Sequence, residues 1–251
     1  GPIISVSTFT NEFIDPYDPA DLYLWTKVEH LGRYLWVRDV LRAELDDGQY
    51  GAATDGQPDT QPSTSHLEVG CGTGYGIEIL SGAVGRITGI DYDERALERS
   101  GDVLAQHPDL PCQLVLLDLD SQQITDAIDR AAGAPFDSIT AFEVLEHVDD
   151  GERLLAGVAA VSKPGTRLFL SVPNSRYEHR HPDGSPANAY HDRIYELDEV
   201  LGMLDNAGFT VNRVLGQAWV NQMLQGEKVV KGIDRDAPRP SLNPTLHERA
   251  A

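Results

Sequence analysis

The chain has 251 residues, 41% hydrophobic and 24% charged, which is the composition of a soluble globular domain with a sizeable core. Its 40 acidic and 20 basic residues give a formal net charge of −20, which disfavours a nucleic-acid partner unless the basic residues cluster. The sequence has no apolar run of about 18 residues, so we expect no membrane span and no membrane partner. Two cysteines and an N-terminus without a basic-then-apolar signal layout favour a cytoplasmic protein.

Residues 1–45 are predicted to form an N-terminal helical segment. Apolar side chains recur every three positions from Leu22 to Leu31, the spacing of one helical face. Residues 46–64 are rich in Gly, Pro, Asp, Gln and Thr, a composition that buries no core and predicts a flexible linker. We expect the helical segment to pack back onto the domain that follows the linker.

From residue 65 onward, strands and helices alternate, which predicts a mostly parallel sheet covered by helices on both faces. The predicted strands are 65–70, 86–91, 113–118, 137–142, 166–172 and 209–215. The predicted helices are 75–83, 94–106, 121–132, 149–162 and 196–207. We assign this domain to residues 65–233, and expect the tail 234–251, with its three prolines, to be irregular.

The first predicted strand runs into a glycine-rich loop. The loop glycines are Gly70, Gly72, Gly74 and Gly76. Because glycine has no Cβ, such a loop can turn tightly and let a ligand touch its backbone. In open α/β sheets, cofactors bind at the carboxyl ends of the strands. The glycine spacing differs from the dinucleotide-binding pattern, and no Lys-Ser/Thr pair follows as a P-loop requires. The alternative to a binding site is a purely structural turn.

Acidic residues follow the next two strands. Asp91 ends the second strand about 20 residues after the glycine loop, where an acid accepts hydrogen bonds from a ribose diol. Asp118 ends the third strand, where it can accept from the amine of an adenine. The alternatives are a helix N-terminal acid for Asp91 and a turn acid for Asp118.

The stretch E-V-G-C-G-T-G at 68–74, together with these acids, resembles the class I S-adenosylmethionine-dependent methyltransferases over residues 65–216. The resemblance implies a Rossmann-like, doubly wound sheet of seven strands, and S-adenosylmethionine as cofactor. It implies a cofactor site made of Glu68, Gly70, Gly72, Asp91, Tyr92, Asp118, Leu119 and Phe142. The first three would contact the methionine part, the next two the ribose and the following two the adenine, with Phe142 beside the sulfonium.

A second cluster of polar residues follows the fourth strand. If a helix begins at Glu143, then Glu143, Glu146 and His147 fall on one face and can bind Mg²⁺. A fourth ligand, His191, lies in the long polar segment 174–195, which we interpret as a lid. His147 and His191 are also candidate general bases. The alternative is a site without metal, in which the glutamates orient the cofactor or cap a helix.

The motif E-V-L-E-H-V at 143–148 resembles that of the ubiquinone-pathway O-methyltransferases. The E-x-x-E-H spacing plus a later His also resembles the small-RNA 3′-terminal 2′-O-methyltransferases, which hold a metal there. The acidity of the chain departs from the RNA family, and the chain lacks the membrane-contacting insertion of the ubiquinone family. We therefore expect O-methylation of a small-molecule hydroxyl on a sugar, phenol or natural product, by a monomer or homodimer. The alternatives are N- or C-methylation, or a non-catalytic binding module.

Overall fold

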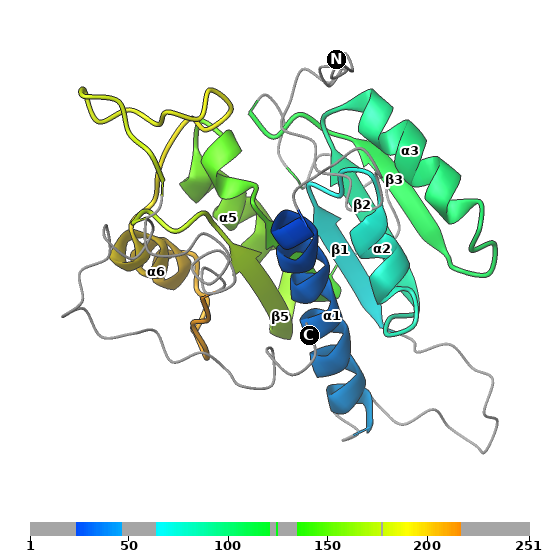
Figure 1. Ribbon diagram of the computed structural model, residues 1–251. Coiled ribbons are helices and arrows are strands. Elements are labelled where there is room, and N and C mark those ends of the chain that lie inside the picture. Colours follow the sequence, from blue (N-terminus) through cyan, green and yellow to red (C-terminus); the bar gives the residue numbers. More distant parts are fainter. Residues whose placement is uncertain (1–23, 47–63, 121–123, 125–134, 177, 217–251) are drawn as a thin grey trace, which may run out of the picture.

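A single parallel sheet organises the chain. The computed structural model describes residues 24–46, 64–120, 124, 135–176 and 178–216 (Figure 1). The strands are β1 (Ser65–Val69), β2 (Arg86–Asp91), β3 (Cys112–Leu116), β4 (Phe136–Phe142) and β5 (Ser162–Ser171). They pair in parallel in the order β3-β2-β1-β4-β5. Strands β2 and β3 lie on one side of β1 and strands β4 and β5 on the other, so the strand order reverses between β1 and β4. In such sheets, ligands bind at this switch point.

Helices cover both faces of the sheet (Figure 1). They are α1 (Leu24–Asp46), α2 (Tyr75–Leu80), α3 (Glu94–Leu104), α5 (Gly151–Ala160) and α6 (Leu197–Asn206), with a short 3₁₀ helix, η1 (Leu145–His147). One apolar core joins α1 and α2 to the sheet, for example through Val37, Ile77 and Ile87. A second core joins α5 and α6 to the opposite face, through residues such as Leu155 and Met203. This arrangement confirms the predicted α/β Rossmann-like fold.

The N-terminal helix α1 packs directly against α2 (Figure 1). Its residues Tyr34, Val37 and Leu41 are buried in the same core as α2. The close approach depends on Gly76, because a Cβ there would lie 2.2 Å from Glu68 Oε1 and 2.4 Å from the Tyr34 ring. Helix α1, which covers residues 24–45 of the predicted segment, thus packs against the domain that follows it.

One predicted strand differs from the structure, and the described residues do not confirm the seven strands of the prediction. The described residues form five strands, and the predicted strand 209–215 is irregular chain after α6, with Val211 and Val214 exposed. A strand needs a hydrogen-bonded neighbour, and no other segment within the described ranges pairs with 209–215. The predicted helix 121–132, the linker 46–64 and the tail 234–251 lie outside the described residues, apart from Asp46, Thr64 and Ile124. Of the helices that the structure describes, none has the length and apolar character to cross a bilayer.

The contact at Gly76 gives a stability prediction. Gly76→Ala places a methyl group against Glu68 and Tyr34, so we expect it to lower the free energy of unfolding by about 1–3 kcal/mol. Gly32→Ala is the matched control, because a Cβ at Gly32 in α1 meets nothing within 4 Å. That change should stabilise the helix by about 0.5–1 kcal/mol. Chemical denaturation of both variants measures the two effects, and equal effects would contradict the packing of α1.

Candidate active site

A cavity of about 510 Å³ lies at the carboxyl ends of the strands. Seven of the eight predicted cofactor residues line it, namely Gly70, Gly72, Asp91, Tyr92, Asp118, Leu119 and Phe142. The same cavity is lined by Glu143, Glu146, His147 and His191. The structure therefore brings the predicted cofactor residues and the polar cluster to one site.

The glycine loop has a backbone that only glycine adopts without strain. Gly70, Gly72 and Gly74 have φ angles of 70°, 54° and 85°, all in the left-handed region. A Cβ at Gly70 would also lie 2.6 Å from Val144 Cγ2, so the loop passes close to the turn after β4. These constraints explain the glycines at 70, 72 and 74 and leave the loop backbone open to the cavity.

Asp91 is fixed at the end of β2 by two backbone amides. The amide of Gly72 donates to its Oδ2 at 2.8 Å, and the amide of Asp93 donates to its Oδ1 at 3.0 Å. Burial raises the pKa of Asp91, while these hydrogen bonds oppose the rise. The carboxylate is thus held in one orientation at the cavity wall, as a polar group that recognises a diol requires.

Tyr92, Asp118 and Leu119 form the outer wall of the cavity. The Tyr92 side chain is 54% exposed, and Leu119 packs against the core. Asp118 Oδ1 accepts from the amide of Asp120 at 3.0 Å, and Arg153 donates to the carbonyl of Leu119 at 2.7 Å. This wall therefore has the mixed apolar and polar character that suits a heterocyclic ring.

Glu68 lies behind the loop rather than in the cavity. It is fully buried, and Tyr34 of α1 donates to its Oε1 at 2.6 Å. Burial is the main cause that raises the pKa of Glu68 to about 8, and the hydrogen bond from Tyr34 opposes it. Direct contact of Glu68 with a methionine group, as the resemblance implies, does not match this position; its observed contact is to α1.

The helix expected at Glu143 does not form. Glu143 has a φ of 53°, the one positive value for a non-glycine residue in the described ranges, and the next α-helix begins at Gly151. The prediction that Glu143, Glu146 and His147 share a helical face is therefore wrong. The Glu143 carboxylate instead accepts from Arg33 Nη1 at 2.7 Å and from Ser171 Oγ at 2.6 Å.

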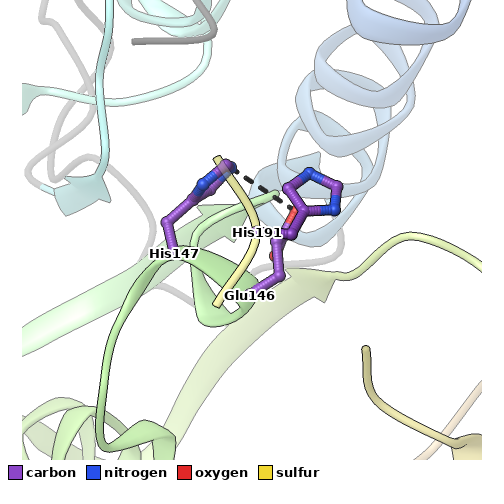
Figure 2. Close-up of side chains that lie close together, drawn as sticks. All are labelled: Glu146, His147 and His191. Carbon is purple, nitrogen blue, oxygen red and sulfur yellow. Dashed lines mark ion pairs between the residues drawn. The ribbon is translucent and has the colours of Figure 1, made fainter. Parts of the chain in front are cut away.

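Three of the four predicted metal ligands do come together (Figure 2). Glu146, His147 and His191 offer ligand atoms that all lie within 4.8 Å of one another. Glu146 is 1% exposed, and neither of its carboxylate oxygens has a hydrogen-bond partner within the described part of the chain. Burial, and next the charge of Glu143, raise the pKa of Glu146 to about 9. A buried carboxylate without a hydrogen bond is costly, so this group fits a site that receives a cation.

The two imidazoles of this cluster are oriented by the segment 174–195. His147 Nδ1 lies 2.6 Å from the carbonyl oxygen of Tyr190, which requires a proton on Nδ1 and leaves a lone pair on Nε2. His191 Nδ1 lies 3.1 Å from Glu178 Oε2, and its Nε2 lies 3.1 Å from the Asn188 amide nitrogen. A histidine whose second nitrogen donates to a carbonyl or carboxylate is typical of metal sites.

Several of these partners carry no sequence signal. Arg33 precedes Glu143 by 110 residues, and Tyr190 acts through its backbone carbonyl. Glu178 and Asn188 lie in the polar segment that we interpret as a lid, but nothing in their spacing marks them as histidine partners. The segment docks on η1 through the amide of Asp192, which donates to the carbonyl of Glu146 at 2.8 Å.

A family model described as a methyltransferase domain matches residues 29–214, and the chain belongs to this family. A probable S-adenosylmethionine-dependent methyltransferase of Mycolicibacterium smegmatis is 29% identical over 150 residues, which cover 60% of this chain and 53% of the relative. A ubiquinone biosynthesis O-methyltransferase of Coxiella burnetii is 33% identical over 116 residues, covering 45% and 44% of the two chains. The chain thus spans about half the length of the curated relatives it matches.

Solved structures support the fold. Magnesium protoporphyrin IX methyltransferase from Synechocystis PCC 6803, with bound S-adenosylmethionine, superposes with a TM-score of 0.51 at 16% identity and covers 79% of both chains. A methyltransferase from Mesorhizobium loti has a TM-score of 0.50 at 18% identity, covering 76% of this chain and 91% of that one. The predicted resemblance to S-adenosylmethionine-dependent methyltransferases is confirmed.

The buried position of Glu68 predicts a pH-dependent stability. Because the pKa of Glu68 is raised to about 8 in the folded state, the unfolded chain releases its proton at lower pH. The contribution of Glu68 to stability therefore falls as pH rises from about 4.5 to about 8. We expect Glu68→Gln, which keeps an acceptor for Tyr34, to gain stability relative to wild type across this range and to level off above it. Urea denaturation from pH 5 to 9 measures the difference, and a constant difference would contradict the raised pKa.

The position of Asp91 predicts an effect on cofactor affinity. Asp91→Ala removes a charged acceptor, one anchor of the glycine loop at Gly72 and one anchor of the turn at Asp93, so we expect S-adenosylhomocysteine to bind about 10–100-fold more weakly. Asp109→Ala is the matched control, because Asp109 is exposed and lies outside the cavity. Titration calorimetry on both variants tests this, and unchanged affinity in Asp91→Ala would refute the ribose assignment.

Proposed function

We propose that this chain methylates a hydroxyl group of a small molecule, such as a sugar, a phenol or another natural product, with S-adenosylmethionine as donor. The observation that carries the proposal is a single cavity that joins the glycine loop to two oriented imidazoles. The similarity to the Coxiella burnetii ubiquinone biosynthesis O-methyltransferase supports oxygen as the acceptor atom. Both cysteines are free thiols, which suits the cytoplasm as compartment.

The reaction needs a deprotonated acceptor in line with the methyl group. The acceptor oxygen attacks the methyl carbon, an O–C bond forms, and the C–S bond breaks with its electron pair left on sulfur. S-adenosylhomocysteine and the methyl ether are the products, and the acceptor proton leaves to solvent. The cavity walls contribute by holding both reactants at the required angle and distance.

Two arrangements of the polar cluster can remove the acceptor proton. In the first, His147 Nε2 acts as general base, since its lone pair is available and Nδ1 carries the proton. In the second, Glu146, His147 and His191 would hold a divalent cation, for which the sequence motif predicts Mg²⁺. Such a cation acidifies a hydroxyl bound to it. His147 cannot serve in both ways, because each role uses the Nε2 lone pair.

We favour the cation arrangement because of Glu146. With His147 as base, the buried Glu146 carboxylate has no hydrogen bond within the described residues, and its Oε1 lies 3.9 Å from His147 Nε2 (Figure 2). A bound cation supplies a partner and uses both imidazoles in the orientation that the segment 174–195 gives them. His191 Nε2 would exchange its contact with the Asn188 amide for the cation.

Chelation tests this choice. We expect removal of divalent cations with EDTA to lower methyl transfer at least 10-fold in a panel of catechols, phenols and sugars, and added cation to restore it. Glu146→Gln should lose the restoration, while Glu152→Gln, a change at an exposed glutamate of α5, should keep it. Release of S-adenosylhomocysteine measures the rate. Full turnover in EDTA would return the proton transfer to His147.

The methyl-transfer assay and cofactor binding distinguish O-methylation from two other functions. Transfer of a ¹³C-labelled methyl group to nitrogen or carbon gives a different chemical shift in the product, which would exclude O-methylation. Failure to bind S-adenosylhomocysteine would favour a non-catalytic binding module.

A further inference from the structure

We propose that Arg33 of α1 determines which cation the site accepts, because it holds the Glu143 carboxylate apart from Glu146, His147 and His191. The inference rests on the cation arrangement of the proposed function. The sequence motif favours Mg²⁺ as the ion. Arg33 lies outside that motif and here sets which ion binds.

Glu143 is held by α1 and β5 together. Arg33 Nη1 lies 2.7 Å from Glu143 Oε1 and 2.7 Å from Ser171 Oγ, and Ser171 Oγ lies 2.6 Å from Glu143 Oε1. The amide of Glu143 donates to the Ser171 carbonyl at 3.1 Å. The Arg33 side chain is 11% exposed, so this ion pair is screened less by solvent than a surface pair.

Without Arg33, the Glu143 carboxylate would be available as a fourth ligand. It lines the same cavity as Glu146 and stands three residues before it in the chain. A cation between them would draw them together, unless the guanidinium of Arg33 already neutralises one of them.

The remaining donor set decides the ion. Glu146, His147 and His191 offer one carboxylate and two imidazoles. Mg²⁺ prefers oxygen ligands in octahedral geometry, whereas imidazole suits first-row ions such as Co²⁺ and Zn²⁺. A set of two carboxylates and two imidazoles is harder and more negative, and favours Mg²⁺ relative to the three-residue set. Arg33 thus makes the site favour ions that bind imidazole nitrogen, such as Co²⁺ and Zn²⁺, over Mg²⁺.

Cation titration of the full chain tests the inference without an acceptor. Co²⁺ binding is followed by its visible absorption bands, and Mg²⁺ affinity by competition against Co²⁺. We expect wild type to bind Co²⁺ at least 100-fold more tightly than Mg²⁺, and Arg33→Met to reduce that ratio about 10-fold. The double variant Arg33→Met/Glu143→Gln should restore the wild-type ratio. Arg42→Met is the matched control, because Arg42 lies on α1 and bonds to the Gly82 carbonyl instead.

The outcomes separate this inference from the proposed function. Binding of S-adenosylhomocysteine shows that each variant is folded. The role of Arg33 is refuted, and the cation site stands, if wild type binds Co²⁺ but Arg33→Met has the wild-type ratio of Co²⁺ to Mg²⁺ affinity. The same conclusion follows if the double variant has the ratio of Arg33→Met. If wild type binds no Co²⁺, the cation arrangement itself fails.

The single variant Glu143→Gln gives a second test that does not depend on removing Arg33. With Glu143 already held apart from the ion, this variant should leave Co²⁺ affinity unchanged. A loss of Co²⁺ affinity as large as that of Glu146→Gln would make Glu143 a ligand in the wild-type protein and overturn the inference.

Discussion

The hydrogen bond from Tyr34 to the buried Glu68 connects the N-terminal helix to the first strand of the sheet, and the geometry of the cavity depends on it. A buried carboxyl needs a donor, and Tyr34 supplies one where the missing side chain of Gly76 leaves room for its ring. With Tyr34 fixed, the neighbouring positions of α1 face the carboxyl ends of the strands. His30 then meets the Tyr75 hydroxyl at 2.9 Å, and Arg33 reaches Glu143.

The part of the site that is predicted to bind the cofactor is built from segments that are local in sequence. The glycine loop follows β1 and Asp91 ends β2, and one hydrogen bond from Gly72 to Asp91 joins them. Each feature follows from a strand that ends in a tight turn. The polar cluster is different, because its two imidazoles take their orientation from Tyr190 and Glu178, and the backbone of Glu146 is held by the amide of Asp192.

This difference explains which features the sequence can predict. Strand periodicity and the glycine pattern are local, so β1 to β5 fall on predicted strands and seven predicted cofactor residues line the cavity. The spacing of Glu143 and Glu146 indicates one helical face only if a helix begins there. The side chain of Asp150 instead caps α5 by accepting from the amide of Arg153.

Longer-range features have no local signature. The ion pair between Arg33 and Glu143 depends on how α1 docks, which no pattern near residue 143 reveals. The predicted strand at 209–215 has a suitable apolar pattern, but a strand also needs a partner that its own sequence does not specify. The carboxylate of Glu146, buried without a hydrogen bond, can likewise be recognised only once its surroundings are known.

The docking of the segment 174–195 has a consequence for how such domains diversify. Because Tyr190 and Glu178 fix the imidazoles from outside the sheet, the segment can be exchanged or remodelled without disturbing the glycine loop or Asp91. The predicted donor site and the proposed acceptor site are therefore under separate evolutionary constraints. The first depends on the ends of the strands, and the second depends also on one surface segment.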